Sequence, residues 1–239
     1  VVVVTGASRG IGAGIARRFG RDGAAVMVHY RQAEAEADAV AREIEDAGGE
    51  AATYAADMAS EEAVTAMFEA AATRWGRVDV LVANAAVASD AAVAEGTSAE
   101  FDRVMGANLR GTWLCMREAA RHMEYGGRII AVSSGQTRRH LPGVGFYTAS
   151  KAAVEALVVT MAREVGARGI TVNAVLPGAT SPGMFDRRPE ADRQRFAAMS
   201  PMQRLGTPEE VADLVAYLAR PEAGWITGQR LGVDGGAFN

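Results

Sequence analysis

The sequence predicts a single α/β domain, doubly wound, with a central seven-stranded parallel sheet and helices on both faces. Two observations carry this prediction. Short runs rich in valine and isoleucine alternate with longer segments of helical periodicity, an order that favours right-handed βαβ units. Several runs, such as VVVV and VDVLVA, are apolar throughout, as is typical of strands buried on both sides. The length of 239 residues suits one domain, 1–239, with one sizeable core.

The expected elements follow one another along the chain. Strands are expected at 1–5, 24–30, 51–56, 78–83, 127–133, 170–176 and 230–234. Helices are expected near 11–22, 34–47, 60–74, 98–124, 147–168 and 207–220. An irregular segment at 178–204 follows the sixth strand and contains a short helix near 190–199. Long loops in compact domains are usually functional, so this segment is expected to be a substrate lid.

Composition excludes several classes of protein. The net charge of −4 and the scattered arginines disfavour nucleic-acid binding. No apolar run approaches the roughly 18 residues that a membrane span needs, and VVVV is too short for a signal-peptide core. The single cysteine, Cys115, excludes an intramolecular disulfide and suits a reducing compartment, so a cytoplasmic location is expected. His29, His122 and His140 lack metal-ligand spacing, and no metal is expected.

Residues 5–12, TGASRGIG, form a glycine-rich turn between the first strand and the first helix. Gly6, Gly10 and Gly12 let the backbone turn tightly and approach a phosphate closely. The N-terminus of the helix then offers free N–H groups and the positive end of its dipole. This context predicts a dinucleotide site, with a tight turn that binds no ligand as the alternative.

The end of the second strand bears on the choice between NAD and NADP. An acidic residue there would bind the ribose 2′-hydroxyl of NAD, but this strand ends in VMVHYRQ. Arg31 follows the strand, and Arg9 lies within the glycine loop. Two guanidinium groups near the ribose would favour a 2′-phosphate, so NADP(H) is expected. Alternatively, each arginine is a solvated surface charge.

Lys151 is the only lysine in the chain, and it lies four residues after Tyr147. At a helix start, residues four apart share a face. Their ordinary pKa values are about 10.4 for lysine and about 10 for tyrosine. An ammonium beside the phenol is therefore expected to lower the tyrosine pKa, which would make the phenol a general acid/base near neutral pH.

These motifs together identify the chain as similar to the short-chain dehydrogenase/reductase family, and the likeness covers essentially the whole length. TGASRGIG resembles its cofactor loop, and Asp57 in AADMAS matches the acid that binds the adenine ring. LVANAA matches the segment after the fourth strand. Asn108 in GANLRGTW and Ser134 in IIAVSSG, thirteen residues before Tyr147, match catalytic positions. LPG at 176–178 matches the turn beside the nicotinamide, and the tail from PMQR to VDGG resembles the 3-oxoacyl-carrier-protein reductase branch.

The resemblance implies a Rossmann-type domain and a mechanism for reducing a carbonyl. Tyr147 would give its proton to the developing alkoxide, and Ser134 would hydrogen-bond the carbonyl oxygen. Lys151 would lower the tyrosine pKa and hold the nicotinamide ribose, and Asn108 would hold a water that links Lys151 to solvent. The cofactor site would comprise Gly6, Ser8, Arg9, Gly10, Ile11, Gly12, Arg31, Asp57, Met58, Asn84, Ala85, Tyr147, Lys151, Pro177, Gly178 and Thr180.

Alternatives remain for several positions. Ser133 stands beside Ser134, and only the spacing selects the second serine. Asn108 could merely kink a helix, and Asp57 could simply end a strand. The chain also departs from the family pattern. Ala83 and Ala86 replace an Asn and a Gly after the fourth strand, and Pro182 stands where a threonine commonly binds the carboxamide. Thr180 could take over that role.

The expected substrate is a 3-oxoacyl thioester, small or carrier-bound, because the tail resembles that branch. A sugar, polyol or small ketone is the alternative within the family, and a cofactor-binding regulator without turnover is an alternative of another class. Four lid arginines could receive an acidic substrate or carrier, or they could be solubilising charges: Arg187, Arg188, Arg193 and Arg195. The helix at 147–168 is apolar almost all round, which predicts a homotetramer or a dimer.

Overall fold

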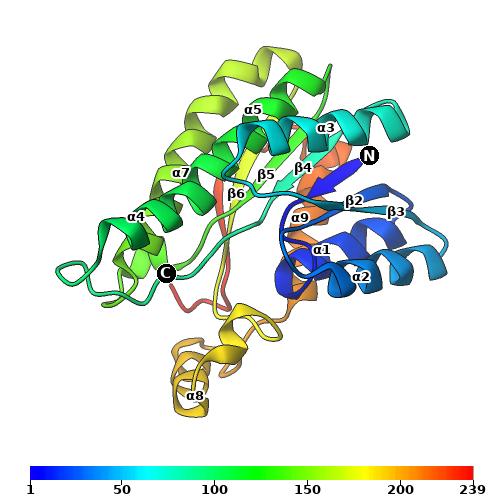
Figure 1. Cartoon of the computed structure of the whole chain (residues 1–239). Coiled ribbons are helices and arrows are strands. Elements are labelled where there is room, and N and C mark those ends of the chain that lie inside the picture. The colour runs from blue at the N-terminus through cyan, green and yellow to red at the C-terminus, as the bar shows by residue number, and fades with distance from the viewer. Residues whose placement is uncertain (239) are drawn as a thin grey trace.

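The computed structural model describes residues 1–238, with the side chain of Arg187 outside the description. Seven parallel strands form one sheet in the order β3-β2-β1-β4-β5-β6-β7 (Figure 1). The strands are β1 (Val2–Val4), β2 (Ala25–Tyr30), β3 (Glu50–Ala55), β4 (Val80–Ala83), β5 (Arg128–Val132), β6 (Thr171–Pro177) and β7 (Arg230–Val233). The predicted seven-stranded parallel sheet is confirmed.

The helices cover both faces of the sheet, also as predicted. They are α1 (Gly10–Arg21), α2 (Glu34–Asp46), α3 (Glu61–Trp75), α4 (Ser98–Val104), α5 (Gly111–His122), α6 (Gln136–Arg139), α7 (Gly145–Val165), α8 (Glu190–Met199) and α9 (Pro208–Ala219). A π-helical segment, Met105–Arg110, joins α4 to α5. Short 3₁₀ segments lie at Gly166–Arg168, Met184–Arg187 and Pro221–Ala223.

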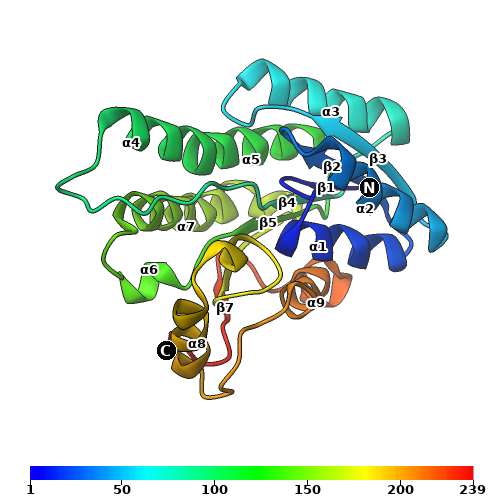
Figure 2. The same ribbon diagram turned by 60° about the horizontal axis from the view of Figure 1, so that its bottom comes forward.

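The alternation of side chains along β1 shows how the layers form. Val3 packs into a core that contains residues of α3, α5 and α7. Val2 and Val4 point to the opposite face and pack with residues of α1, α2 and α9. Since successive side chains of a strand point to opposite faces, an apolar run such as VVVV serves both cores at once. Figure 2 shows the same division, with α1 and α9 on one side and α5 and α7 on the other.

The predicted helix at 98–124 is confirmed as one helical run from Ser98 to His122, with a π-helical segment in its middle. Asn108 lies in this segment with no exposed surface, and its side chain bonds to groups outside the helix. Such π segments are frequent at functional sites. Because a π turn holds an extra residue, the apolar pattern of α5 is shifted in phase from that of α4.

The other predicted bounds differ only slightly from the observed ones. One short helix, α6, was not predicted, and it begins shortly after β5. The lid also differs from the other connections. Its helix α8 has no buried residue and projects from the body of the domain in Figure 1. The strand order reverses between β1 and β4, and in such sheets ligands bind at the carboxyl ends of the strands near the reversal.

Candidate active site

The predicted site residues gather at the carboxyl edge of the sheet. The glycine loop follows β1, Arg31 follows β2, and Asp57 comes soon after β3. Asn84 follows β4, and Ser134 lies two residues after β5. Pro177 ends β6, with Gly178 directly after it, and Tyr147 and Lys151 lie in the first two turns of α7.

The glycine loop has the geometry that its sequence predicts. Gly6 and Gly10 have φ values of 62° and 56°, in the left-handed region that other residues seldom adopt. A Cβ atom on Gly12 would lie 2.3 Å from the carbonyl oxygen of Gly6, so no side chain fits there. The loop therefore brings bare backbone to the N-terminus of α1, as a phosphate site requires.

Asn84 and Thr5 lock this loop to the end of β4. The side-chain amide of Asn84 donates to the carbonyl oxygens of Thr5 at 2.9 Å and Gly6 at 3.0 Å. In return, the hydroxyl of Thr5 accepts the backbone N–H groups of Asn84 at 2.9 Å and Ala85 at 3.0 Å. Asn84 thus holds the backbone of the cofactor loop in place through two carbonyl groups. The sequence reasoning missed Thr5, although it is the first letter of the TGASRGIG motif.

The residues expected around the adenosine half differ in exposure. Asp57 is exposed, and one of its carboxylate oxygens accepts the N–H of Ala59 at 2.9 Å. Met58 is buried beside α5 and receives a contact from the Cys115 thiol. Arg9 and Arg31 are both exposed, and neither has a carboxylate partner within residues 1–238. Their guanidinium groups therefore remain available to an anion.

Ser134, Tyr147 and Lys151 form the candidate catalytic cluster. The Ser134 hydroxyl lies near the Tyr147 phenol and acts to lower its pKa. Lys151 is 2% exposed, and its ammonium nitrogen lies 5.9 Å from the centroid of the Tyr147 ring. The same nitrogen donates to the carbonyl oxygen of Val132, the last residue of β5, at 2.7 Å. The cluster therefore depends on α7 being held against the end of β5.

The expected lowering of the Tyr147 pKa is wrong for the chain alone. Burial raises the pKa of Tyr147, and the Ser134 hydroxyl acts in the opposite direction without outweighing it. Burial also lowers the pKa of Lys151 to about 8. The phenol consequently keeps its proton at neutral pH, and the lysine is mostly charged there but close to titration. This state suits a general acid better than a general base.

The two adjacent serines have different partners, which separates their roles. Ser133 donates to the carboxylate of Glu155 at 2.6 Å, and both side chains are buried. It also donates, over a longer 3.4 Å, to the backbone oxygen of Lys151. Ser134 contacts Tyr147 instead and accepts the N–H of Gln136 at 3.2 Å. Ser133 thus ties β5 to α7, and Ser134 is left to face the site.

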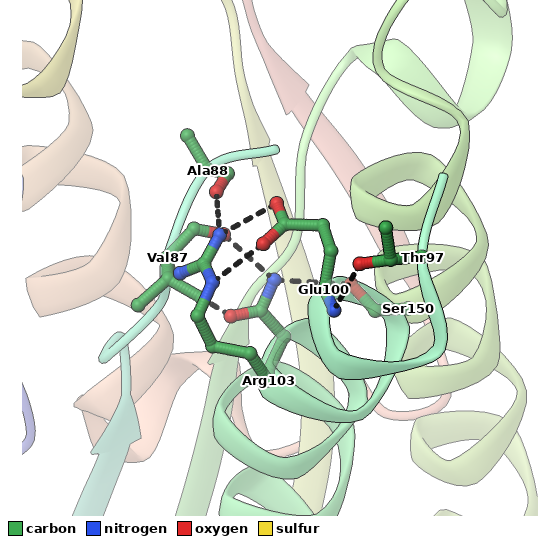
Figure 3. Close-up of polar contacts among 7 residues, drawn as sticks. Val87, Ala88, Thr97, Glu100, Arg103 and Ser150 are labelled. Carbon is green, nitrogen blue, oxygen red and sulfur yellow. Dashed lines mark hydrogen bonds and ion pairs between the residues drawn. The ribbon is translucent and has the colours of Figure 1, made fainter. Parts of the chain in front are cut away.

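Asn108 connects the loop after β4 to the start of α7. Its side chain accepts the N–H of Val87 at 2.8 Å and donates to the carbonyl of Val87 at 3.0 Å. It also donates to the hydroxyl of Ser150 at 3.1 Å, which in turn donates to the carbonyl of Tyr147 at 2.7 Å. Figure 3 shows Val87 and Ser150 in this network. Asn108 is therefore more than a kink, and its role in holding a water stays a prediction.

Next to this network, Arg103 holds the same loop from α4. Its guanidinium donates to the carbonyl oxygen of Ala88 at 2.7 Å and pairs with both carboxylate oxygens of Glu100 at 2.8 Å (Figure 3). Thr97 caps α4 by accepting the N–H of Glu100 at 3.2 Å. The loop at 84–97 is thus fixed at Val87 and Ala88, close to the predicted nicotinamide end.

The segment after β6 packs against the glycine loop. A Cβ atom on Gly10 would lie 3.2 Å from the Cα of Gly183, which places the first part of the lid over the loop. Thr180 is buried, and its hydroxyl donates to the carbonyl oxygen of Gly178 at 3.1 Å. The oxygen of that hydroxyl can still accept a bond from a carboxamide, so its predicted role stays open.

Two of the lid arginines pair with acids. Arg188 pairs with Asp90, and Arg193 pairs with Glu190. Arg195 is exposed, and the side chain of Arg187 lies outside the described part of the chain. Paired arginines fit the solubilising alternative better than an acidic docking site.

Residues 1–238 contain neither a membrane-spanning helix nor a metal site. Within them no helix combines the length and apolarity needed to cross a membrane. The same residues contain no cluster of histidine, cysteine, aspartate and glutamate side chains arranged for a metal ion.

The fold and this site define a dinucleotide-dependent oxidoreductase with a serine–tyrosine–lysine cluster. A family model described as enoyl-(acyl carrier protein) reductase matches residues 6–237. A short-chain dehydrogenase/reductase of Pestalotiopsis microspora is 38% identical over 250 residues, covering 99% of this chain and 94% of that protein. The chain therefore belongs to the short-chain dehydrogenase/reductase family.

Two further relatives bear on activity. The trihydroxynaphthalene reductase of Colletotrichum orbiculare is 38% identical over 251 residues, covering 99% of this chain and 89% of that protein. The crystal structure of the angucycline C-6 ketoreductase LanV with bound NADP superimposes with a TM-score of 0.94 at 39% identity. That match covers 99% of this chain and 95% of that one.

Proposed function

We propose that this chain is an NADPH-dependent ketoreductase that converts a ketone to a secondary alcohol. The observation that carries the proposal is the cluster at the carboxyl edge of the sheet, where Ser134 and the buried Lys151 both lie beside Tyr147. Two hydroxyl groups can both contact one carbonyl oxygen, and one of them holds a transferable proton. Reduction of a ketone places negative charge on the oxygen that both hydroxyl groups can contact, and the alkoxide then takes the proton, so a ketone suits the site.

The cofactor site fits NADP(H). Arg9 and Arg31 are exposed without carboxylate partners in the described chain, and the residue directly after β2 is Arg31 rather than an acid that would bind a ribose 2′-hydroxyl. Guanidinium groups bind phosphate well because their planar fork of donors matches its oxygens. The NADP bound to LanV supports the same choice. When bound, the cofactor supplies the two electrons and the hydrogen that the carbonyl carbon receives.

The residues of the chain perform the rest of the mechanism. Ser134 and Tyr147 hold the carbonyl oxygen, and their hydrogen bonds strengthen as negative charge develops there. Tyr147 then donates its proton, which its raised pKa keeps in place at neutral pH. The Lys151 ammonium lies near the resulting phenolate and stabilises it. Asn108 keeps the first turns of α7 in position through Ser150.

The relatives favour a polyketide-type substrate, a ketone on a hydroxylated fused-ring skeleton. Trihydroxynaphthalene is by its name a hydroxylated fused-ring compound, and LanV is a ketoreductase. Aromatic and thioether side chains of the lid suit a flat ring system. The rings of Phe185 and Phe196 meet edge to face with centroids 4.8 Å apart, and Met184 is 50% exposed beside them.

A 3-oxoacyl thioester is the second candidate, because the C-terminal motif resembles that branch. The test is NADPH oxidation, followed at saturating cofactor, with a hydroxylated tetralone and with a short 3-oxoacyl thioester. We expect higher kcat/KM for the tetralone and a loss of about 10²-fold or more in Tyr147→Phe, since general acids contribute that much. Preference for the thioester would move the substrate to the second candidate. NADPH binding without turnover on either ketone would favour a regulator.

The outward face of α7 supports the proposed homotetramer or dimer. Ala149, Ala152 and Ala156 lie exposed along it, where a second copy of α7 could pack closely. Light scattering during gel filtration tests this directly. A dimer or tetramer is expected, whereas a monomer at micromolar concentration would overturn it. Ala152→Arg, on the exposed face, is expected to shift the distribution toward monomer.

A further inference from the structure

His29 lies at the end of β2, beneath the cofactor loop, and is 2% exposed. Its Nδ1 atom accepts the backbone N–H of Gly6 at 2.9 Å. Its Nε2 atom lies 3.1 Å from the carbonyl oxygen of Ala56, and its own carbonyl accepts the N–H of Ala7 at 2.8 Å. One residue therefore holds both the start of the glycine loop and the chain just before Asp57.

These contacts require a neutral imidazole in one tautomer. Nδ1 must accept from an N–H, so the proton lies on Nε2 and is donated to the Ala56 carbonyl. Burial lowers the pKa of His29, while the Ala56 carbonyl and the Asp57 carboxylate act in the opposite direction. The neutral form thus fits both its surroundings and its partners.

His29 accepts two of the backbone N–H groups at the start of the glycine loop. The N–H groups of Gly6 and Ala7 both donate to His29, so they cannot serve an anion. The anion must then be held further along the loop, at the N-terminus of α1. The ring also sets the separation between that phosphate position and Asp57, which are the two places that the adenosine half of a dinucleotide must reach.

We propose that His29 is a positioning residue for the adenosine half of the cofactor, an inference that rests on the proposed NADPH site. It contacts no part of the cofactor itself. It holds the glycine loop and the chain before Asp57 at a fixed separation, so removing its two ring contacts weakens binding of the adenosine half. Binding of the nicotinamide half, and turnover at saturating NADPH, stay nearly unchanged.

The test compares His29→Leu with a control variant, Asn173→Leu. Asn173 is 1% exposed on β6 and also bridges two backbone groups, donating to Ile226 at 2.7 Å and accepting from Gln229 at 3.0 Å. Both variants lose two buried hydrogen bonds, so both should melt at lower temperature. Only His29→Leu is expected to raise the Kd for adenosine 2′,5′-bisphosphate and for NADPH, by roughly tenfold or more.

Calorimetric titration of the protein without substrate gives these constants. A Kd within about twofold of wild type in His29→Leu would overturn the proposal, since two lost contacts of ordinary strength exceed that change. Equal weakening in both variants would overturn it too, because the effect would then follow from lost stability alone. A wild-type chain that binds no NADPH would instead refute the proposed function.

Two conservative variants keep the proposal testable if His29→Leu does not fold. His29→Asn places an acceptor near the position of Nδ1 and keeps the Gly6 contact. His29→Gln reaches only the position of Nε2 and keeps the Ala56 contact. Since the phosphate position depends on the loop, His29→Asn is expected to bind adenosine 2′,5′-bisphosphate more tightly than His29→Gln. The reverse order would overturn the proposal.

Discussion

The adjacent serines at the end of β5 should separate stability from catalysis. In Ser133→Ala, the buried carboxylate of Glu155 loses the donor that lies 2.6 Å away. In Ser134→Ala, the site loses the hydroxyl that faces Tyr147, together with a 3.2 Å contact to the N–H of Gln136. The first change should chiefly lower the free energy of unfolding, and the second should chiefly lower turnover.

The magnitudes follow from these contacts. Hydrogen bonds to charged groups are worth about 1.5 to 3 kcal/mol, and a neutral bond is worth about 1 kcal/mol. In a domain of this size, 1 kcal/mol shifts Tm by about 2 to 4 °C. Ser133→Ala should therefore lower Tm by about 3 to 12 °C, against about 2 to 4 °C for Ser134→Ala. Loss of a donor to a developing oxyanion costs about 10²- to 10³-fold in kcat, which is the expectation for Ser134→Ala.

Thermal melting and steady-state NADPH oxidation, measured on both variants, give the comparison. Ser133→Ala should keep most of its kcat despite its lower Tm. The double variant Ser133→Ala/Glu155→Leu should recover much of the stability, because removing both partners leaves no buried group unsatisfied. If Ser133→Ala melted like wild type and lost turnover as severely as Ser134→Ala, the assignment of the two serines would be wrong.

Four further predictions concern the cofactor loop, the lysine and the arginines. Gly12→Ala should raise the Kd for NADPH by about tenfold or more, since a Cβ there meets backbone at 2.3 Å, whereas Gly166→Ala, with nothing within 4 Å, should leave it unchanged. Because burial lowers the pKa of Lys151 to about 8, kcat/KM for reduction should fall as pH rises through 8 and the ammonium is lost. Lys151→Arg should fold but lose most activity, because a planar guanidinium does not replace the compact ammonium that lies beside Tyr147; near wild-type turnover would contradict this. Arg9→Ala/Arg31→Ala should weaken NADPH binding and leave NADH binding nearly unchanged, and equal weakening of both would show that neither arginine binds the 2′-phosphate.

The sequence predicted the order of elements because each depends on local pattern. Apolar runs, glycine spacing and the Tyr147–Lys151 interval all lie within short stretches, and the sheet follows from their alternation. The selection of Ser134 over Ser133 also depended on spacing alone, and the different partners of the two serines agree with it. No structural contact tests the catalytic roles, which stay predictions.

Contacts between distant residues could not be predicted in this way. The sequence gives no sign of the role of His29, because its partners Gly6 and Ala56 are brought to it only by the pairing of β2 with its neighbours. The sign of the Tyr147 pKa shift was missed for the same reason. A short interval suggests that an ammonium is near, but burial is a property of the whole fold, and here it dominates.

The most direct test of the central claim is the fate of deuterium from NADPH labelled at C4 of the nicotinamide ring. The account predicts that deuterium appears on the carbinol carbon of the alcohol formed from a ketone, and that Tyr147→Phe forms almost none of this product. Deuterium found instead at a carbon of a former double bond, or NADPH that binds tightly while no ketone is ever reduced, would contradict it.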